Sequence, residues 1–352
     1  MLSCPMLAPQ ERSIVEWPPD QQPLLTVVVD TEAEFNWSQK ASRKAVGIKS
    51  AREQWRAHKI YDLYRVRPTY VLDYPVASQP DAYEAILDLI RGARAEIGAH
   101  LQPWDTPPIL EELSDANSYP GNLPKELERA KLRTLTETIE RNLGIRPRVY
   151  KAGRYGVGPA TAGLLSEFGY EVDVSVLPGT DLSFQLGPDF SRCGARPYWF
   201  GSSDALLEVP LSIGFTGLFA SFGVPLYSIV SRPELIKLHV PAILARLHLL
   251  DRITITPEGV SFAEQRRLTK SLLKKGHRVF CLTYHSPSLL PGNTPYVRTA
   301  SDLDAFLGRI DQYIEFFMGE IGGRAVTPLE IKQMAEQQAP KRIREAEIGR
   351  SA

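Results

Sequence analysis

The stretch VVVDTEAEF at residues 27–35 runs three valines into Asp30 and places Glu32 two residues later. Such an apolar run is typical of a strand that is buried on both faces, as in parallel sheets covered by helices. Side chains two apart on an extended chain point to the same side, so Asp30 and Glu32 would share one small space. Close carboxylates raise each other's pKa or bind a cation, which predicts a functional site. The alternative is a solvated loop or a helix cap.

Short apolar runs alternate with amphipathic stretches along the rest of the chain. We predict strands at 24–30, 68–73, 95–99, 147–152, 170–176, 250–256 and 278–284. We predict helices at 50–64, 80–93, 123–143, 158–168, 233–248, 261–275 and 301–319. This alternation indicates an α/β fold with about seven parallel strands, as an open sheet or a closed barrel. Glycine motifs of dinucleotide-binding and P-loop proteins do not follow any of these strands, which argues against both chemistries.

The chain is predicted to form a single domain at 23–337, after an N-terminal extension at 1–22. Residues 177–230 are too long for a simple connection, so we interpret them as an insertion that covers the mouth of the barrel. The tail at 338–352 is charged and weakly patterned, and we expect it to be flexible.

The composition limits the classes of function. The chain has 41 basic and 41 acidic residues, so no overall positive field attracts nucleic acid. The three cysteines, Cys4, Cys193 and Cys281, are widely spaced, which predicts buried thiols in a reducing compartment. We therefore expect a cytoplasmic protein. The sequence also lacks a secretion signal pattern and any apolar run long enough for a membrane span.

Polar residues recur where the predicted strands end. His100 closes the third strand, Lys151 and Arg154 follow the fourth, Asp173 lies in the fifth, and His285 closes the last. The carboxyl ends of barrel strands meet at one mouth, so these side chains would converge with the two acids of the first strand. Each residue alone is as readily structural, but the set predicts a catalytic site.

Five segments follow one another in the chain: VVDTE, EIGAH, YKAGRYG, EVDVSV and LTYHSPS. In this order they resemble the motifs of the polysaccharide deacetylase superfamily, the NodB-type carbohydrate esterases. The segments PTYVLDYPVA, HLQPWDTPP and HSPSLLPGNTPY resemble its WalW-like branch. The resemblance covers about residues 24–335 and implies a distorted (β/α) barrel that hydrolyses an acetyl group on a sugar.

The resemblance also implies roles for individual residues. Asp30 would be the general base and His285 the general acid. Glu32 and His100 would hold a divalent metal, with zinc as the first choice. Lys151 or Arg154 would pair with Asp30 and keep it ionised. The candidates for substrate contacts are Trp104, Tyr155, Tyr74 and Asp173.

In one motif the chain departs from the family, and this departure leaves open whether a metal is bound. The second motif of the family has two histidines four residues apart, but this chain has Trp104 at the second position and Gln102 nearby. A neutral amide is a poor zinc ligand, so the metal is either held by Asp30, Glu32, His100 and water, or absent.

The motifs and the resemblance are compatible with three functions. The preferred one is a deacetylase of an N-acetylated sugar or of a nucleotide-linked or lipid-linked glycan precursor. The second is a metal-free hydrolase of another C–N bond, in an amide or a cyclic ureide. The third is an inactive carbohydrate-binding partner of glycan-synthesis enzymes. Asp30 and His285 favour an enzyme, because binding alone needs no acid and base at strand ends.

Overall fold

The computed structural model describes residues 5–7, 9–35, 37, 39, 41–202 and 205–338. The predictions for Cys4 and for all of the C-terminal tail beyond residue 338 lie outside the described residues.

Strand β1 (Leu24–Thr31) forms the centre of the fold, and all eight of its residues are buried. It pairs in parallel with β10 (Val279–His285) on one side and with β2 (Thr69–Leu72) on the other. Its valines contact apolar groups on both faces of the sheet, which is why the strand has no polar–apolar alternation before its end.

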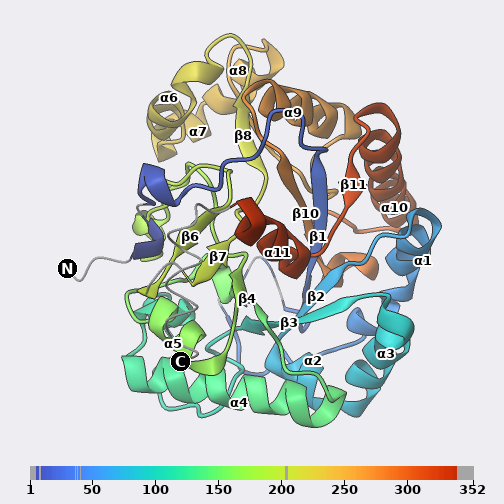
Figure 1. The fold of residues 1–352 in the computed structure, drawn as a ribbon. Coiled ribbons are helices and arrows are strands. Elements are labelled where there is room, and N and C mark those ends of the chain that lie inside the picture. Colours follow the sequence, from blue (N-terminus) through green and yellow to red (C-terminus); the bar gives the residue numbers. More distant parts are fainter. Residues whose placement is uncertain are drawn as a thin grey trace.

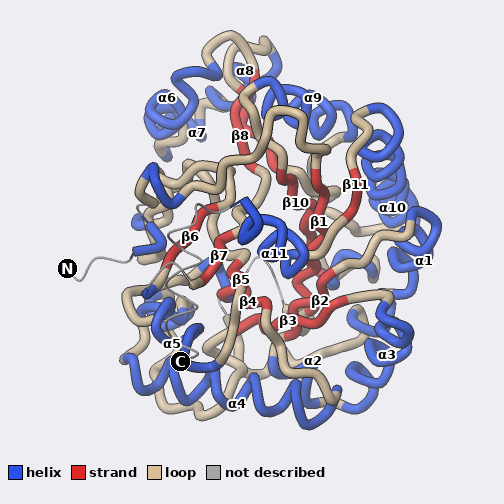
Figure 2. The backbone as a smooth tube through the Cα atoms, in the orientation of Figure 1, coloured by secondary structure: helices blue, strands red, loops and turns tan. Residues whose placement is uncertain are grey.

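The main sheet has the strand order β10-β1-β2-β3-β4-β5-β7-β6, and β11 pairs with the beginning of β1. Every pairing from β10 to β7 is parallel, and only β6 at the edge is antiparallel. The sheet curls into a partly open barrel (Figure 2), which confirms the predicted fold class. The strands not yet defined are β3 (Glu96–Leu101), β4 (Val149–Ala152), β5 (Val172–Asp173), β6 (Tyr198–Phe200), β7 (Leu206–Glu208) and β11 (Arg324–Ala325).

The predicted strand at 250–256 forms, but it lies outside the main sheet. It is β9 (Asp251–Thr254), which pairs antiparallel with β8 (Ile213–Thr216) in a separate two-stranded sheet. Its predicted place in the parallel sheet is wrong, because β7 occupies the position beside β5. Since β6 and β7 both come from residues 177–230, this segment contributes two strands to the main sheet, and its predicted role as a cover over the mouth stays a prediction.

Helices surround the strands and separate into two groups in Figure 1. The helices packed around the main sheet are α1 (Trp55–Tyr64), α2 (Tyr74–Ser78), α3 (Pro80–Ile90), α4 (Lys125–Leu143), α5 (Thr161–Phe168), α9 (Phe262–Lys274), α10 (Ala300–Glu315) and α11 (Pro328–Gln338). The second group, at the top of Figure 1, consists of α6 (Gly223–Val230), α7 (Pro233–Lys237) and α8 (Val240–Arg246).

The helix predicted at 233–248 is split into α7 and α8. His239 has a left-handed backbone with φ of 56°, and Pro241 follows it in the first turn of α8. A proline has no N–H for a continuing helix and is well placed only in a first turn. The break therefore has a local cause that the apolar pattern did not show.

Helix α11 lies at the amino-terminal end of the sheet, across the centre of Figure 1. It follows β11, which pairs with Leu24 and Leu25 at the beginning of β1. Arg67, just before β2, forms an ion pair with Glu330 of α11 at 3.0 Å. The carboxyl ends of the strands, where the polar residues lie, are therefore left open on the opposite side.

The register of the strands brings these polar residues together. Asp30 of β1 lies beside His285 of β10, and His100 of β3 lies beside Lys151 of β4. In a flat sheet β1 and β4 would be about 14 Å apart, three strand spacings of about 4.8 Å. The Lys151 ammonium nevertheless lies 2.6 Å from the Asp30 carboxylate. The length of the Lys151 side chain and the curl of the sheet together close this distance.

Two further predictions concern the chain as a whole. Cys193 and Cys281 are buried, as predicted, and burial raises the pKa of the Cys281 thiol to about 12. In the described part of the chain, none of the helices has both the length and the apolarity that crossing a membrane requires.

Candidate active site

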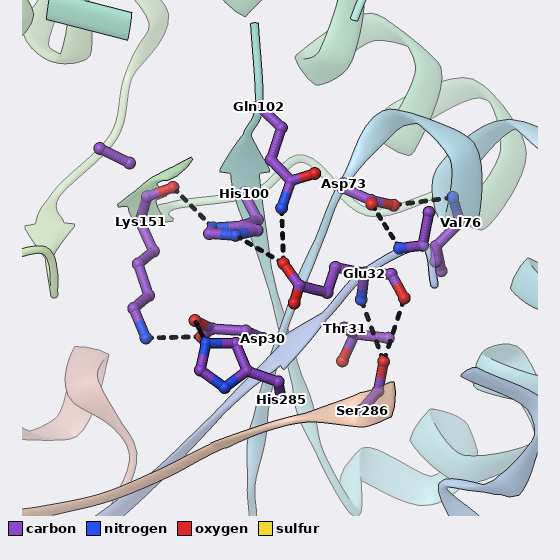
Figure 3. A network of polar contacts seen from close by, with 12 residues as sticks. Asp30, Thr31, Glu32, Asp73, Val76, His100, Gln102, Lys151, His285 and Ser286 are labelled. Carbon is purple, nitrogen blue, oxygen red and sulfur yellow. Dashed lines mark hydrogen bonds and ion pairs between the residues drawn. The ribbon is translucent and has the colours of Figure 1, made fainter. Parts of the chain in front are cut away.

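Asp30 and Lys151 form a buried ion pair at the carboxyl end of the sheet (Figure 3). The Lys151 Nζ donates to Asp30 Oδ1 at 2.6 Å, and both side chains are at most 3% exposed. Burial by itself raises the pKa of a carboxyl, but the Lys151 ammonium, with His100 and His285, lowers the pKa of Asp30 below its usual 3.8. Asp30 is therefore ionised at neutral pH. Lys151 also donates to Thr283 Oγ1 at 3.3 Å, which fixes its position.

His285 lies on the other side of Asp30, held by Glu258. Its Nε2 is 3.5 Å from Asp30 Oδ2, and its Nδ1 is 2.8 Å from Glu258 Oε2. Glu258 also accepts the backbone N–H of His285 at 3.2 Å and the hydroxyl of Ser288. Burial lowers the pKa of an imidazole, but the Glu258 carboxylate, with smaller contributions from Glu32 and Asp30, raises the pKa of His285 to about 9. The imidazole therefore carries a proton on both nitrogens at neutral pH.

Glu32 and His100 form a second buried pair beside Asp30. His100 Nε2 lies 3.4 Å from Glu32 Oε2, and His100 Nδ1 lies 3.1 Å from the carbonyl oxygen of Lys151. Burial would lower the pKa of His100, but its contact with Glu32 and the nearby Asp30 charge raise it above 6.5. Gln102 donates its amide N–H to the same Glu32 oxygen at 2.5 Å (Figure 3).

The side chains around Glu32 do not fit a catalytic zinc ion. Such a site has three protein ligands and one open position. Glu32 and His100 supply two, and Asp30, the third carboxylate or imidazole that the sequence offered, is in contact with Lys151 at 2.6 Å and His285 at 3.5 Å. The Gln102 amide N–H points at the carboxylate oxygen that faces His100. Within the described ranges, no group of three or more His, Cys, Asp or Glu side chains is arranged to hold a metal. The sequence-based expectation of a zinc site therefore lacks a complete ligand set, because positions 102 and 104 are Gln and Trp.

The loop that carries Glu32 is fixed by backbone hydrogen bonds. Asp73 accepts the N–H of Ala33 at 2.6 Å and the N–H of Val76 at 2.9 Å, so it both caps α2 and holds the loop. The Ser286 hydroxyl accepts the N–H of Glu32 at 3.1 Å. Burial raises the pKa of Asp73 to about 7 despite these hydrogen bonds. The two acids of the opening motif are thus held in place by residues from neighbouring strand ends.

Asp30, Glu32, His100 and His285 line one cavity of about 800 Å³. This volume lies within the range of about 300–1,000 Å³ that is common for small-molecule sites. Aromatic side chains line much of its wall: Phe35, Trp37, Trp104, Tyr119, Tyr155 and Tyr296. Trp104 and Tyr155, which the sequence offered as substrate contacts, both line this cavity, and their contact with a substrate stays a prediction.

Arg154 lines the cavity but does not pair with Asp30. Its guanidinium donates to Ser118 Oγ at 2.5 Å and to Gln185 Oε1 at 3.3 Å, and it lies 4.4 Å from the centre of the Tyr119 ring. Arg154 and Tyr155 both have left-handed backbones, with φ of 51° and 61°. Of the two cations that the sequence offered as a partner for Asp30, the structure selects Lys151.

Tyr74 and Asp173 do not line the cavity, so the structure does not bring these two predicted substrate contacts to it. Tyr74 is the first residue of α2. Asp173 is fully buried next to Glu208 of β7, and it accepts the N–H of Ser175 at 2.7 Å. Burial raises the pKa of both Asp173 and Glu208. This pair connects two neighbouring strands within the sheet.

Glu258 and Trp37 were not predicted from the sequence. Glu258 lies four residues after the end of β9. An acid near the end of a predicted strand is the pattern that identified Asp30, and the same pattern could have identified Glu258. Trp37 lies in the loop after the opening motif, with its ring centre 4.8 Å from that of His285 in an edge-on arrangement. It also stacks on Phe35 at 5.1 Å and meets Tyr296 edge-on at 5.9 Å. These rings form an aromatic wall beside the imidazole.

Known proteins resemble this chain in their three-dimensional structure, whereas comparisons of sequence give no match. Neither the family models nor the curated protein sequences give a match to this chain. A provisionally assigned polysaccharide deacetylase from Mycobacterium smegmatis superposes over 94% of this chain and 96% of its own, with a TM-score of 0.54 and 18% identity. An allantoinase superposes over 91% of this chain and 92% of its own, with a TM-score of 0.50 and 15% identity. With the curled parallel sheet, these similarities show that the chain has the NodB-type fold of the polysaccharide deacetylases.

Proposed function

We propose that this protein is a hydrolase that removes the acetyl group from an N-acetylated sugar or glycan precursor. The observation that carries the proposal is the line of contacts from Lys151 through Asp30 and His285 to Glu258 beside the cavity. An ionised carboxylate next to a protonated imidazole supplies a general base and a general acid to one reacting bond. The fold of the Mycobacterium smegmatis protein supports acetylated carbohydrate as the substrate class. The WalW-like branch, the cytoplasmic location and the glycan-synthesis partners stay predictions.

In the proposed reaction Asp30 accepts a proton from a water molecule as the water oxygen attacks the acetyl carbonyl carbon. His285 then donates a proton to the amide nitrogen while the C–N bond breaks, so the products are acetate and a free amine. Lys151 keeps Asp30 ionised through its 2.6 Å contact. Glu258 holds the imidazole by Nδ1, which leaves the Nε2 proton directed toward Asp30 and the cavity.

The walls of the cavity support a sugar as the bound group. Trp37 and Tyr296 stand on the side of His285, and Tyr155 lies near Lys151, with the ammonium 5.5 Å from its ring centre. Flat aromatic rings with a few polar groups between them are the common lining of sites that orient a small ligand. Arg154, whose guanidinium is a hydrogen-bond donor, also lines the cavity.

Replacement of Glu258 by Gln is expected to move the alkaline limit of activity to lower pH. In the wild-type protein the acid form of His285 persists below its pKa of about 9 and is lost as the pH rises through that value. The Gln variant keeps a hydrogen-bond acceptor near Nδ1 but removes the negative charge that raises the pKa. The measurement is the pH dependence of kcat/KM for both proteins, with an expected shift toward about 6.5.

The matched control for this pH profile is Glu264→Gln, which changes an acid in the first turn of α9, away from the cavity. Its alkaline limit should coincide with that of the wild type. An unchanged alkaline limit in Glu258→Gln would show that His285 is not the group that supplies the proton.

The function is tested by acetate release from a panel of N-acetylated amino sugars and short glycans, before and after treatment with a chelator. We expect acetate release with at least one substrate, and the same rate after chelation, because Asp30 is paired with Lys151 and His285, and Glu32 and His100 alone do not make a complete zinc site. Metal content measured by mass spectrometry should be well below one ion per chain.

The deacetylase assignment and the metal independence are contradicted by different results. No acetate from any N-acetylated substrate, together with hydrolysis of a cyclic ureide or a simple amide, would replace the deacetylase assignment. Acetate release that stops on chelation and returns with zinc would retain the deacetylase and overturn metal independence.

A further inference from the structure

The helices α6, α7 and α8 expose an unusual number of large apolar side chains. We call residues 218–248 the α6–α8 lobe, which projects at the top of Figure 1. Of the 18 large apolar residues that are exposed in the described part of the chain, eight belong to this lobe of 31 residues. They are Leu218, Phe219, Phe222, Ile229, Ile236, Leu238, Ile243 and Leu247, and most are more than 45% exposed.

The lobe is apolar on its inner side as well. Phe215, Val230 and Leu250 form a small core of their own, and Val224, Leu226, Tyr227, Val240 and Leu244 pack against it. The α6–α8 helices therefore place apolar residues both against this core and toward solvent. A helix that is apolar on all sides is typical of a buried or membrane-contacting element, and large exposed apolar patches mark interaction surfaces.

The polar residues of the lobe are mainly basic. The lobe contains Arg232, Lys237 and Arg246 but only one acid, Glu234, whereas the whole chain has equal numbers of both. All three basic side chains are exposed, and none has an ion pair with a described residue. These positive charges have no protein partner to neutralise them in the described part of the chain, so they are available to an anionic surface.

The lobe is connected to a wall of the cavity. It is carried by the β8–β9 hairpin, where the guanidinium of Arg252 lies 5.7 Å from the Tyr227 ring centre. Arg252 also donates to the hydroxyl of Thr180, in the loop whose Leu177 and Leu182 line the cavity. The apolar surface is thus held by side-chain contacts to the loop that borders the candidate active site.

We propose that the α6–α8 lobe docks on the surface of an anionic lipid membrane. Helices that lie in a membrane interface combine Phe and Leu with Lys and Arg, and this lobe exposes residues of both kinds. Basic residues beside such a surface gain attraction from anionic headgroups, and the low number of acids avoids repulsion. The proposal concerns binding only, and it holds whatever reaction the cavity performs.

The first experiment measures co-sedimentation of the full chain with vesicles of phosphatidylcholine, alone or mixed with phosphatidylglycerol. We expect binding to the mixed vesicles that weakens with added salt, and much weaker binding to phosphatidylcholine. The apolar lobe variant should bind the mixed vesicles about tenfold or more weakly. This variant carries Phe222→Ser, Leu238→Ser and Leu247→Ser, at positions that are 62%, 66% and 61% exposed.

A matched control changes three exposed apolar residues outside the lobe: Leu63→Ser, Leu110→Ser and Ile145→Ser. This control should bind the mixed vesicles like the wild type. A charge variant, Arg232→Gln with Lys237→Gln and Arg246→Gln, should lose the preference for phosphatidylglycerol. Circular dichroism melts of all the proteins establish that each one is folded.

Two results would overturn the proposal. The first is an absence of binding to either vesicle, or an equal loss of binding in the lobe variant and the control outside the lobe. The second is a dimer in sedimentation velocity that the lobe variant abolishes, with no vesicle binding, which would assign the surface to a second copy of the chain.

Discussion

Replacement of Asp30 by Asn is expected to lower kcat for acetate release by about 10²–10⁴-fold, the usual contribution of a general base. The amide has nearly the same shape as the carboxylate but cannot accept a proton from the attacking water. Asp30 is 2% exposed and in contact with both Lys151 and His285, so the variant removes the carboxylate that lies between these two cations. The measurement is kcat at saturating substrate, on protein whose melting curve shows one folded transition.

The matched control for Asp30→Asn is Glu128→Gln, which also changes a buried acid to its amide. Glu128 lies on α4, accepts a hydrogen bond from Thr161 at 2.8 Å and does not line the cavity. Burial raises its pKa to about 7, so the amide replaces a group that is already partly neutral. Its kcat should stay within a few-fold of the wild type. Unchanged turnover in Asp30→Asn would remove Asp30 from the mechanism.

Replacement of Lys151 by Met is expected to lower the free energy of unfolding by about 3–5 kcal/mol at neutral pH, as for other buried ion pairs that lose one partner. The variant leaves the Asp30 carboxylate buried without the ammonium that lies 2.6 Å away in the wild type. The pKa of Asp30 should rise, and turnover should fall because a larger share of Asp30 is protonated. Chemical denaturation measures the stability, and the pH profile of kcat measures the pKa.

The destabilisation caused by Lys151→Met should depend on pH, because it involves the charge of Asp30. The pKa of Asp30 in the folded protein is lowered below 3.8, so its stabilising contribution is present above pH 3.8 and is lost as the pH falls through the folded-state pKa. The difference between wild type and Lys151→Met should therefore shrink in acid.

A double variant separates charge from packing at this pair. Asp30→Asn combined with Lys151→Met removes both charges, so it should be more stable than Lys151→Met alone. Equal destabilisation in the single and double variants would mean that the Lys151 side chain acts through packing and hydrogen bonds, such as the one to Thr283, and not through its charge on Asp30.

Much of the site was predictable from the sequence because local patterns carry the relevant information. The buried run before Asp30 predicted β1, and the positions of His100, Lys151 and His285 at strand ends predicted that they would converge. Parallel strands with helical connections place all their carboxyl ends on one side, so chain order alone indicates which residues meet. The structure brings Asp30, Glu32, His100, Lys151 and His285 to one place, while their catalytic roles stay to be measured.

The partners of these residues depended on long-range geometry that no local pattern encodes. Lys151 reaches Asp30 because the sheet curls between β4 and β1, whereas the left-handed turn at Arg154 directs its guanidinium to Ser118. Glu258 meets His285 because the segment after β9 runs beside β10, where the Thr283 N–H donates to the Ile255 carbonyl at 3.3 Å.

The sequence by itself thus determined the class of fold and the residues at the strand ends, since the pattern of apolar residues and the chain order can be read along the chain. The tertiary structure alone decided which cation pairs with Asp30, which acid holds His285 and that Gln102 faces Glu32. It also decided that the α6–α8 lobe stays exposed to solvent. The physical reason is that strand pairing, sheet curl and side-chain contacts are set by the packing of the whole chain.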